Sequence, residues 1–289
     1  MIKIVTDTTC DMPSAWFSQY HITTIPMNIQ FGLETFHEGV TITQGDFYQR
    51  IETGGVFPTT SQPSVGEFTE LYEALAADDS EILSIHLTSK LSGTWQSAYL
   101  AAQQLQGKIK VNVLDSLTSS PGLGFMVREA AQLIETGWTV EEIIPRLEAR
   151  RAQINVFIML KDLRYARMSG RVGRLRETVA SLLDIKPIVG VEEGNLIPID
   201  RVRTQKNGFK RMLMMAQAQV GDTPVHVGMV HAMAQTQAED LLAQVESHLN
   251  CRDTFVTDIA LSLAVHFGPG AVGFATYPAE EAGGLEKVL

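Results

Sequence analysis

The feature that most constrains the fold is a repeated alternation of strand and helix patterns in the first half of the chain. Short apolar runs at residues 2–5, 81–87 and 108–114 are strand-like, and helical patterns separate them along the chain. Strands that alternate with helices are joined by crossover connections, which place the strands parallel in one sheet with helices on its faces. The chain is therefore predicted to begin with an α/β domain whose sheet is mainly parallel.

The pattern changes in the second half. Residues 186–191 and 196–202 are apolar runs that flank Glu-Glu-Gly-Asn at 192–195, a pattern typical of a β-hairpin. A hairpin adds an antiparallel pair, so the later sheet is expected to be mixed. We therefore predict an α/β protein of two α/β domains, residues 1–160 with a mainly parallel sheet and flanking helices, and residues 161–289 with a mixed sheet.

Composition narrows the class of protein. The chain has 289 residues, of which 45% are hydrophobic and 19% charged, a balance typical of a compact globular protein. Its formal net charge of −10 argues against general nucleic-acid binding. Cys10 and Cys251 are the two cysteines and lie far apart, so we expect a reducing, cytoplasmic setting. The apolar run at the N-terminus is too short for a signal peptide, and no run approaches the roughly 20 residues of a membrane span.

Charge is unevenly distributed along the chain. Residues 161–211 hold 12 Lys or Arg and 6 Asp or Glu, although the whole chain is acidic. This segment is either a solvated face with structural ion pairs or a local site for an anion or a partner.

Hydroxyl side chains gather in the loops beside the expected strands. Four loops, at residues 6–9, 59–64, 88–94 and 115–120, are rich in Ser and Thr. Ligands of open α/β sheets bind at the carboxyl ends of the strands, so these loops are candidates for one shared site. Helix capping is the simpler interpretation of any single loop. Four such loops together favour a site that holds a carboxylate or a phosphate through neutral donors.

Other chemistries lack their usual patterns. The sequence has no nucleotide-binding glycine loop, no H-E-x-x-H and no C-x-x-C, so neither a metal nor a cofactor is expected. Ser92 precedes Gly93 and could be a nucleophile, but the G-x-S-x-G pattern is absent. His266, before a Gly-Pro-Gly turn, is either a core histidine or a ligand for an anion.

Five motifs in a fixed order resemble those of the DegV family of bacterial fatty-acid-binding proteins, which includes the fatty-acid-binding subunit of fatty acid kinase. The resemblance extends from residue 1 to about residue 277. The motifs are TDTT at 6–9, TSQPS at 60–64, HLTSKLSGT at 86–94, SGRVG at 169–173 and HFGPG at 266–270.

The resemblance implies that one long-chain fatty acid lies buried between the two domains of a protein that does no chemistry itself. A separate kinase subunit would phosphorylate the bound carboxylate, which implies a role in fatty-acid transport or phospholipid metabolism. The residues expected around the carboxylate are Thr8, Thr9, Thr60, Ser61, Ser92, Arg171 and His266.

The arginines of the basic segment are expected to form a docking surface for a protein partner such as that kinase subunit; they are Arg164, Arg167, Arg174 and Arg176. Two alternatives remain open from the residues. One is an enzyme that acts on a small carboxylate or an acyl phosphate, with a base near Ser92. The other is a nucleic-acid-binding regulator that uses the arginines, which salt-dependent binding would reveal.

Overall fold

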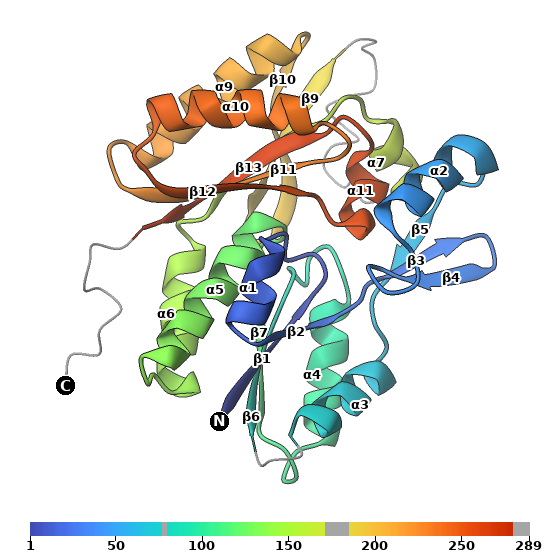
Figure 1. Cartoon of the computed structure of the whole chain (residues 1–289), viewed down its shortest axis with the longest axis vertical. Helices are drawn as coiled ribbons and strands as arrows, with labels where there is room; N and C mark the ends of the chain where they lie inside the picture. The colour runs from blue at the N-terminus through green and yellow to red at the C-terminus, as the bar shows by residue number, and fades with distance from the viewer. Residues whose placement is uncertain (77–79, 171–184, 280–289) are drawn as a thin grey trace.

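The structure, a computed structural model that describes residues 1–76, 80–170 and 185–279, contains three β-sheets with helices packed on them (Figure 1). The strands are β1 (Ile2–Asp7), β2 (Ile22–Ile25), β3 (Asn28–Phe31), β4 (Glu34–His37), β5 (Thr59–Ser61), β6 (Glu81–His86), β7 (Val111–Asp115), β8 (Asn155–Met159), β9 (Lys186–Glu192), β10 (Asn195–Val202), β11 (Val225–His231), β12 (Cys251–Asp258) and β13 (Val272–Pro278). The helices are α1 (Ser14–Gln19), α2 (Gln44–Gly54), α3 (Val65–Leu75), α4 (Thr94–Gln104), α5 (Pro121–Glu135), α6 (Val140–Arg151), α7 (Arg164–Ser169), α9 (Gln205–Val220), α10 (Gln235–His248) and α11 (Leu261–Phe267).

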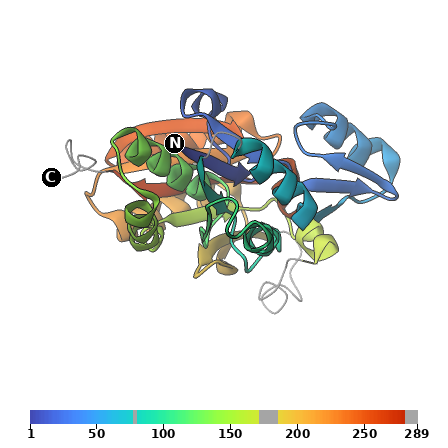
Figure 2. The same ribbon diagram turned by 90° about the horizontal axis from the view of Figure 1, so that it is seen from below.

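The first sheet is parallel, with strand order β2–β1–β6–β7. Neighbouring residues of a strand point to opposite faces, so Ile4 of β1 packs with α5 and α6 while Val5 packs with α3 and α4. Figures 1 and 2 show these helices on the two sides of the sheet. The predicted parallel sheet with flanking helices is confirmed.

The second sheet is mixed, with order β10–β9–β8–β13–β11–β12. The predicted hairpin is confirmed as β9 and β10, which pair antiparallel. Strand β8 pairs with β13 and β9, so it lies in this sheet although it precedes residue 160. The division of the chain into domains at residue 160 stays a prediction.

A third, small antiparallel sheet, β4–β3–β5, has no counterpart in the sequence-based prediction. Residues 23–31 alternate like one edge strand, but the structure divides them into β2 and β3, which belong to different sheets. Pro26 lies between the two strands. Because proline has no N–H to donate to a ladder, the chain leaves the parallel sheet there.

The order of the parallel sheet locates a crevice. From β1 the chain continues to β2 on one side and later to β6 on the other, so the carboxyl ends of β1 and β6 form a topological switch point, where ligands of open α/β sheets bind. These ends point toward the six-stranded sheet (Figure 1). No helix among the described residues is long and apolar enough to cross a membrane.

Candidate functional site

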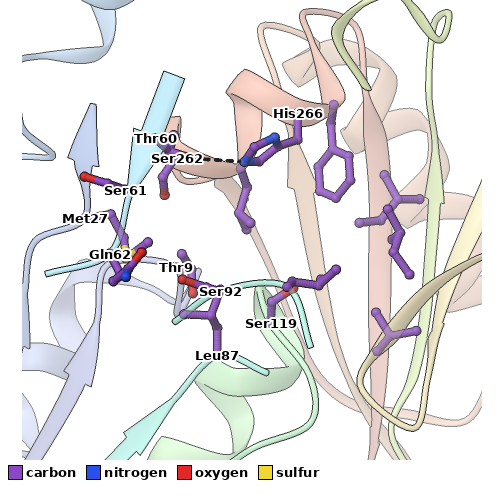
Figure 3. A pocket seen from close by; sticks show the side chains of 16 residues that line it. Thr9, Met27, Thr60, Ser61, Gln62, Leu87, Ser92, Ser119, Ser262 and His266 are labelled. Atoms are coloured by element: carbon purple, nitrogen blue, oxygen red, sulfur yellow. Dashed lines mark hydrogen bonds between the residues drawn. The ribbon is translucent and has the colours of Figure 1, made fainter. Parts of the chain in front are cut away.

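A cavity lies at this switch point. Its walls come from the loops after β1, β6 and β7, from β5, from α11 and from one face of β8–β10. Figure 3 shows the polar side chains that line it gathered on one side. They are Thr9, Thr60, Ser61, Gln62, Ser92, Ser119, Ser262 and His266. The structure therefore brings together five residues that the sequence singled out, namely Thr9, Thr60, Ser61, Ser92 and His266.

Two distant segments meet at this polar end. Thr60 Oγ1 of β5 lies 3.2 Å from His266 Nε2 of α11 (Figure 3). Beside Thr60, the Ser61 hydroxyl accepts a hydrogen bond of 2.8 Å from Gln30 Nε2, which leaves its own hydrogen free to point elsewhere. This end of the cavity therefore offers hydroxyl and imidazole groups, which are suitable donors for an anionic oxygen.

Ser92 stands in the loop that leads into α4. Its Oγ lies 2.8 Å from Thr94 Oγ1 and accepts from the Thr94 N–H at 3.3 Å. The intervening Gly93 allows the side chain of Gln62 to approach closely, since a Cβ there would lie 2.9 Å from Gln62 Nε2. His266 Nε2 thus lies against Thr60, and the Ser92 hydroxyl lies against Thr94.

Two buried carboxylates hold the start of α11. Glu38 accepts from the Ser262 hydroxyl at 2.8 Å and from the Ser262 N–H at 3.1 Å, and Asp11 accepts from the Ala260 N–H at 2.8 Å. Burial raises the pKa of both carboxyls, that of Asp11 well above its usual range. These bonds fix the helix that carries His266.

A third buried carboxylate lies directly behind the cavity wall. Asp7, at the end of β1, accepts from the Thr9 hydroxyl at 2.5 Å and from the Thr9 N–H at 3.1 Å. It also accepts from the Leu87 N–H at 3.0 Å. Asp7 thus ties together the loops that follow β1 and β6, which both line the cavity.

The remaining partner of Asp7 is His86, the last residue of β6. His86 Nδ1 lies 3.0 Å from Asp7 Oδ2, and its Nε2 lies 2.7 Å from Ser84 Oγ, which in turn is 2.7 Å from Tyr72 Oη. All four side chains are 0% exposed. Since a carboxylate accepts, Nδ1 of His86 donates, and in the neutral imidazole Nε2 then accepts from Ser84. Every donor in this chain of bonds therefore points toward Asp7.

Some expected residues lie elsewhere. Thr8 does not line the cavity, because its hydroxyl donates to Glu38 at 2.6 Å and accepts from the Met27 N–H at 3.1 Å. The Thr8 hydroxyl therefore already donates one hydrogen bond and accepts another within the protein, and it is turned away from the cavity. Arg171, Arg174 and Arg176 lie outside the described residues, so their positions stay predictions.

Arg164 and Arg167 are exposed on α7, which packs against α11. The contact is close, because a Cβ on Gly268, just after α11, would lie 2.4 Å from the Tyr165 ring. The two described arginines of the basic segment therefore stand beside the helix that carries His266.

Sequence analysis did not single out several residues that line the cavity; they include Met27, Gln62, Ser119 and Ser262. Gln62 and Ser119 had a usable signal, because both lie in the hydroxyl-rich loops. Ser262 had none, since nothing in its local sequence indicates a bond to Glu38. In the part of the chain that the structure describes, no three His, Cys, Asp or Glu side chains form a cluster suited to a metal ion.

The comparisons with known proteins all indicate the same family. A protein-family model described as "Uncharacterised protein, DegV family" matches residues 1–279. A DegV domain-containing protein of Halalkalibacterium halodurans is 32% identical, with 96% of this chain and 98% of the relative covered, and protein DegV of Bacillus subtilis is 31% identical, with 94% and 97% covered.

Solved structures agree with this result. A DegV family protein of Thermus thermophilus, described by its fatty acid binding, has a TM-score of 0.89 and 31% identity, with 96% of this chain and 99% of that one covered. DegV of Bacillus subtilis, described as a fatty acid binding protein, has a TM-score of 0.86 and 29% identity, with 96% and 99% covered. With a family match over nearly its whole length, this chain belongs to the DegV family.

Proposed function

We propose that this protein binds one long-chain fatty acid in the cavity between the parallel sheet and the six-stranded sheet. The carboxylate binds at the polar end, to Thr60, Ser61, Ser92 and His266, and the acyl chain follows the apolar wall. The observation that carries the proposal is the placement of these four groups at one end of a cavity whose other end is apolar. The two solved relatives described as fatty-acid-binding proteins support it.

The energetics of such a ligand suit both ends of the cavity. An acyl chain of about 14 methylenes gains on the order of 11 kcal/mol by leaving water, before the cost of association. The carboxylate, in contrast, loses several kcal/mol on burial unless it is hydrogen-bonded. Hydroxyl donors at one end of an otherwise apolar cavity reduce that loss, so the two halves of the site serve one amphipathic ligand.

Mass spectrometry tests the proposal directly. Protein purified from cells is denatured, and the released small molecules are extracted and identified. We expect a long-chain fatty acid such as palmitate in near-stoichiometric amount. Protein that releases no fatty acid and takes none up from added palmitate would contradict the proposed function.

His266 is expected to contribute less than the hydroxyl groups do. Replacing His266 with Ala removes one donor to the carboxylate and should weaken palmitate binding by about tenfold to a hundredfold, in line with one hydrogen bond to a charged group of about 1.5–3 kcal/mol. His266→Gln retains a donor near Thr60 and should recover part of the affinity, as measured by displacement of a fluorescent fatty acid. Complete loss of binding in His266→Ala, with full binding in Ser92→Ala, would reverse the roles assigned to the two residues.

The same proposal includes a partner. We propose that Arg164 and Arg167, with Arg174 and Arg176 beyond the described residues, dock a kinase subunit that phosphorylates the bound carboxylate. The position of α7 against α11, next to the polar end of the cavity, supports this use of the surface. Charge at such a surface mainly sets the rate and orientation of association.

Charge reversal separates docking from ligand binding. Arg167→Glu combined with Arg174→Glu should slow acyl-phosphate formation at least tenfold in a reconstituted kinase assay and leave fatty-acid occupancy unchanged. The matched control is Lys206→Glu with Lys210→Glu on α9, which packs on the opposite face of the six-stranded sheet. If the arginine variants lose their fatty acid first, the segment belongs to the ligand site and the docking proposal is wrong.

A further inference from the structure

A second cavity lies on the far side of Val191, a residue of β9. Val191 lines both cavities. The second cavity is bounded by the loop after β7, by the end of α6, by the start of β8, by the β9–β10 hairpin and by one residue of α9. Leu117, Ile154 and Val156 are among its apolar lining residues, and Arg151, Glu192 and Glu193 are among its polar ones. One valine side chain therefore borders the two spaces.

The apolar wall continues from one cavity into the other. Ile158 of β8 lines the first and Val156 lines the second. These residues are two positions apart on one strand, so they point to the same face at a separation of about 7 Å. Both belong to one hydrophobic cluster, against which Ile154 and Val191 pack. The surface that an acyl chain would follow thus extends past Val191.

The position of Val191 is fixed by contacts of its hairpin. The buried Thr88, in the loop after β6, donates from its hydroxyl to the Gly194 carbonyl at the hairpin turn, at 2.9 Å. Gly194 has a φ of +80°, and a Cβ there would lie 2.4 Å from Thr88 Oγ1, so only glycine allows this approach. Across the hairpin, Val191 is paired with Leu196, which also lines the first cavity. The hairpin is therefore held against the same loop that carries Ser92.

Taking the proposed function as its basis, we propose that Val191 sets the length of acyl chain that the protein accepts. With the carboxylate at Thr60 and His266, the chain extends toward the wall made by β8, β9 and β10. A chain whose methyl end stops at Val191 fills the first cavity. A longer chain must pass this side chain to enter the second cavity, so the size of residue 191 determines the preferred length.

A length series tests this assignment. Dissociation constants are measured for saturated fatty acids from decanoate to eicosanoate with the wild-type protein, Val191→Ala and Val191→Phe. In the wild type, affinity should rise about fourfold per methylene, the factor that corresponds to about 0.8 kcal/mol, until the chain reaches Val191 and then level off. Val191→Ala should move this plateau to longer chains. Val191→Phe should move it to shorter ones.

Two further variants keep the test decisive. Val230→Ala removes the same two methyl groups from the same hydrophobic cluster but lines neither cavity, so it should keep the wild-type plateau. Val191→Leu is the smaller enlargement, to be used if Val191→Phe does not fold. Unchanged plateaus in all variants at position 191, with fatty acid still bound, would overturn the role of Val191 and leave the proposed function intact. A wild-type protein that binds no member of the series would instead overturn the proposed function.

Discussion

A chain that carries both Ser92→Ala and Thr60→Val is expected to fold normally and to bind palmitate about a hundredfold to ten-thousandfold more weakly than the wild type. Each substitution removes one hydroxyl donor from the polar end of the cavity. A hydrogen bond to a charged group contributes about 1.5–3 kcal/mol, and two such losses give this range. The apolar wall is unchanged, so the protein should retain a weak affinity for neutral acyl compounds such as fatty alcohols.

The chain offers a matched control for this experiment. Ser89 lies in the same loop as Ser92, and Thr59 precedes Thr60 on β5, but neither lines the cavity. A Ser89→Ala and Thr59→Val double variant removes the same atoms from the same two elements and should keep wild-type affinity. Equal unfolding midpoints would show that neither pair acts through stability. If the Ser92 and Thr60 variant still purifies with full occupancy, the carboxylate does not bind at these hydroxyls.

The polar side chains that line the cavity show which parts of a functional site can be predicted from the sequence. Thr9, Ser92 and Ser119 follow three strands of one parallel sheet, and parallel strands bring their carboxyl ends to one edge. A local pattern of strands and hydroxyl loops is therefore enough to predict that these residues meet. Once the sheet is predicted to be parallel, this prediction needs no knowledge of how the second half of the chain folds.

His266 and Thr60 show where that reasoning ends. They are 206 residues apart and lie on different elements, so their contact depends on how the three sheets pack together. Glu38 and Asp11, which hold α11 through Ser262 and Ala260, are ordinary acidic residues in the sequence. Burial gives them their role, and burial of a single carboxylate leaves no pattern in the residues around it. The small sheet that presents Thr60 was missed for a related reason, because strands of three or four residues are too short to show a period.

Asp7→Ala is expected to cost about 3–5 kcal/mol of the free energy of unfolding, the largest effect on stability predicted for this chain. The substitution leaves His86 Nδ1, the Thr9 N–H and the Leu87 N–H without their acceptor in the interior. Removing one partner of a buried, hydrogen-bonded charge has a cost of this size, because the groups that remain cannot reach water. Urea unfolding monitored by circular dichroism measures the loss.

Asp115→Ala provides the comparison. Asp115 also ends a strand of the parallel sheet and also accepts from loop N–H groups, those of Ser89 and Leu117, but it is partly exposed. Water can replace its bonds, so we expect a loss of about 1 kcal/mol. Equal losses for the two aspartates would show that burial does not set the cost.

Asp7→Asn tests the direction of the hydrogen bonds. The Asn side chain has the shape of Asp but carries an NH₂ group in place of one oxygen. Where this NH₂ replaces Oδ2, it faces His86 Nδ1 and turns that nitrogen from donor to acceptor, and the bond that Oδ2 accepts from the Leu87 N–H is lost. His86 Nε2 would then carry the hydrogen and donate to Ser84, reversing the bonds as far as Tyr72. Nitrogen chemical shifts of His86 should therefore report the Nδ1–H tautomer in the wild type and the Nε2–H tautomer in Asp7→Asn, with a stability loss between those of Asp7→Ala and Asp115→Ala. An Nε2–H tautomer already present in the wild type would contradict the role of Asp7 as the acceptor at the end of this chain of bonds.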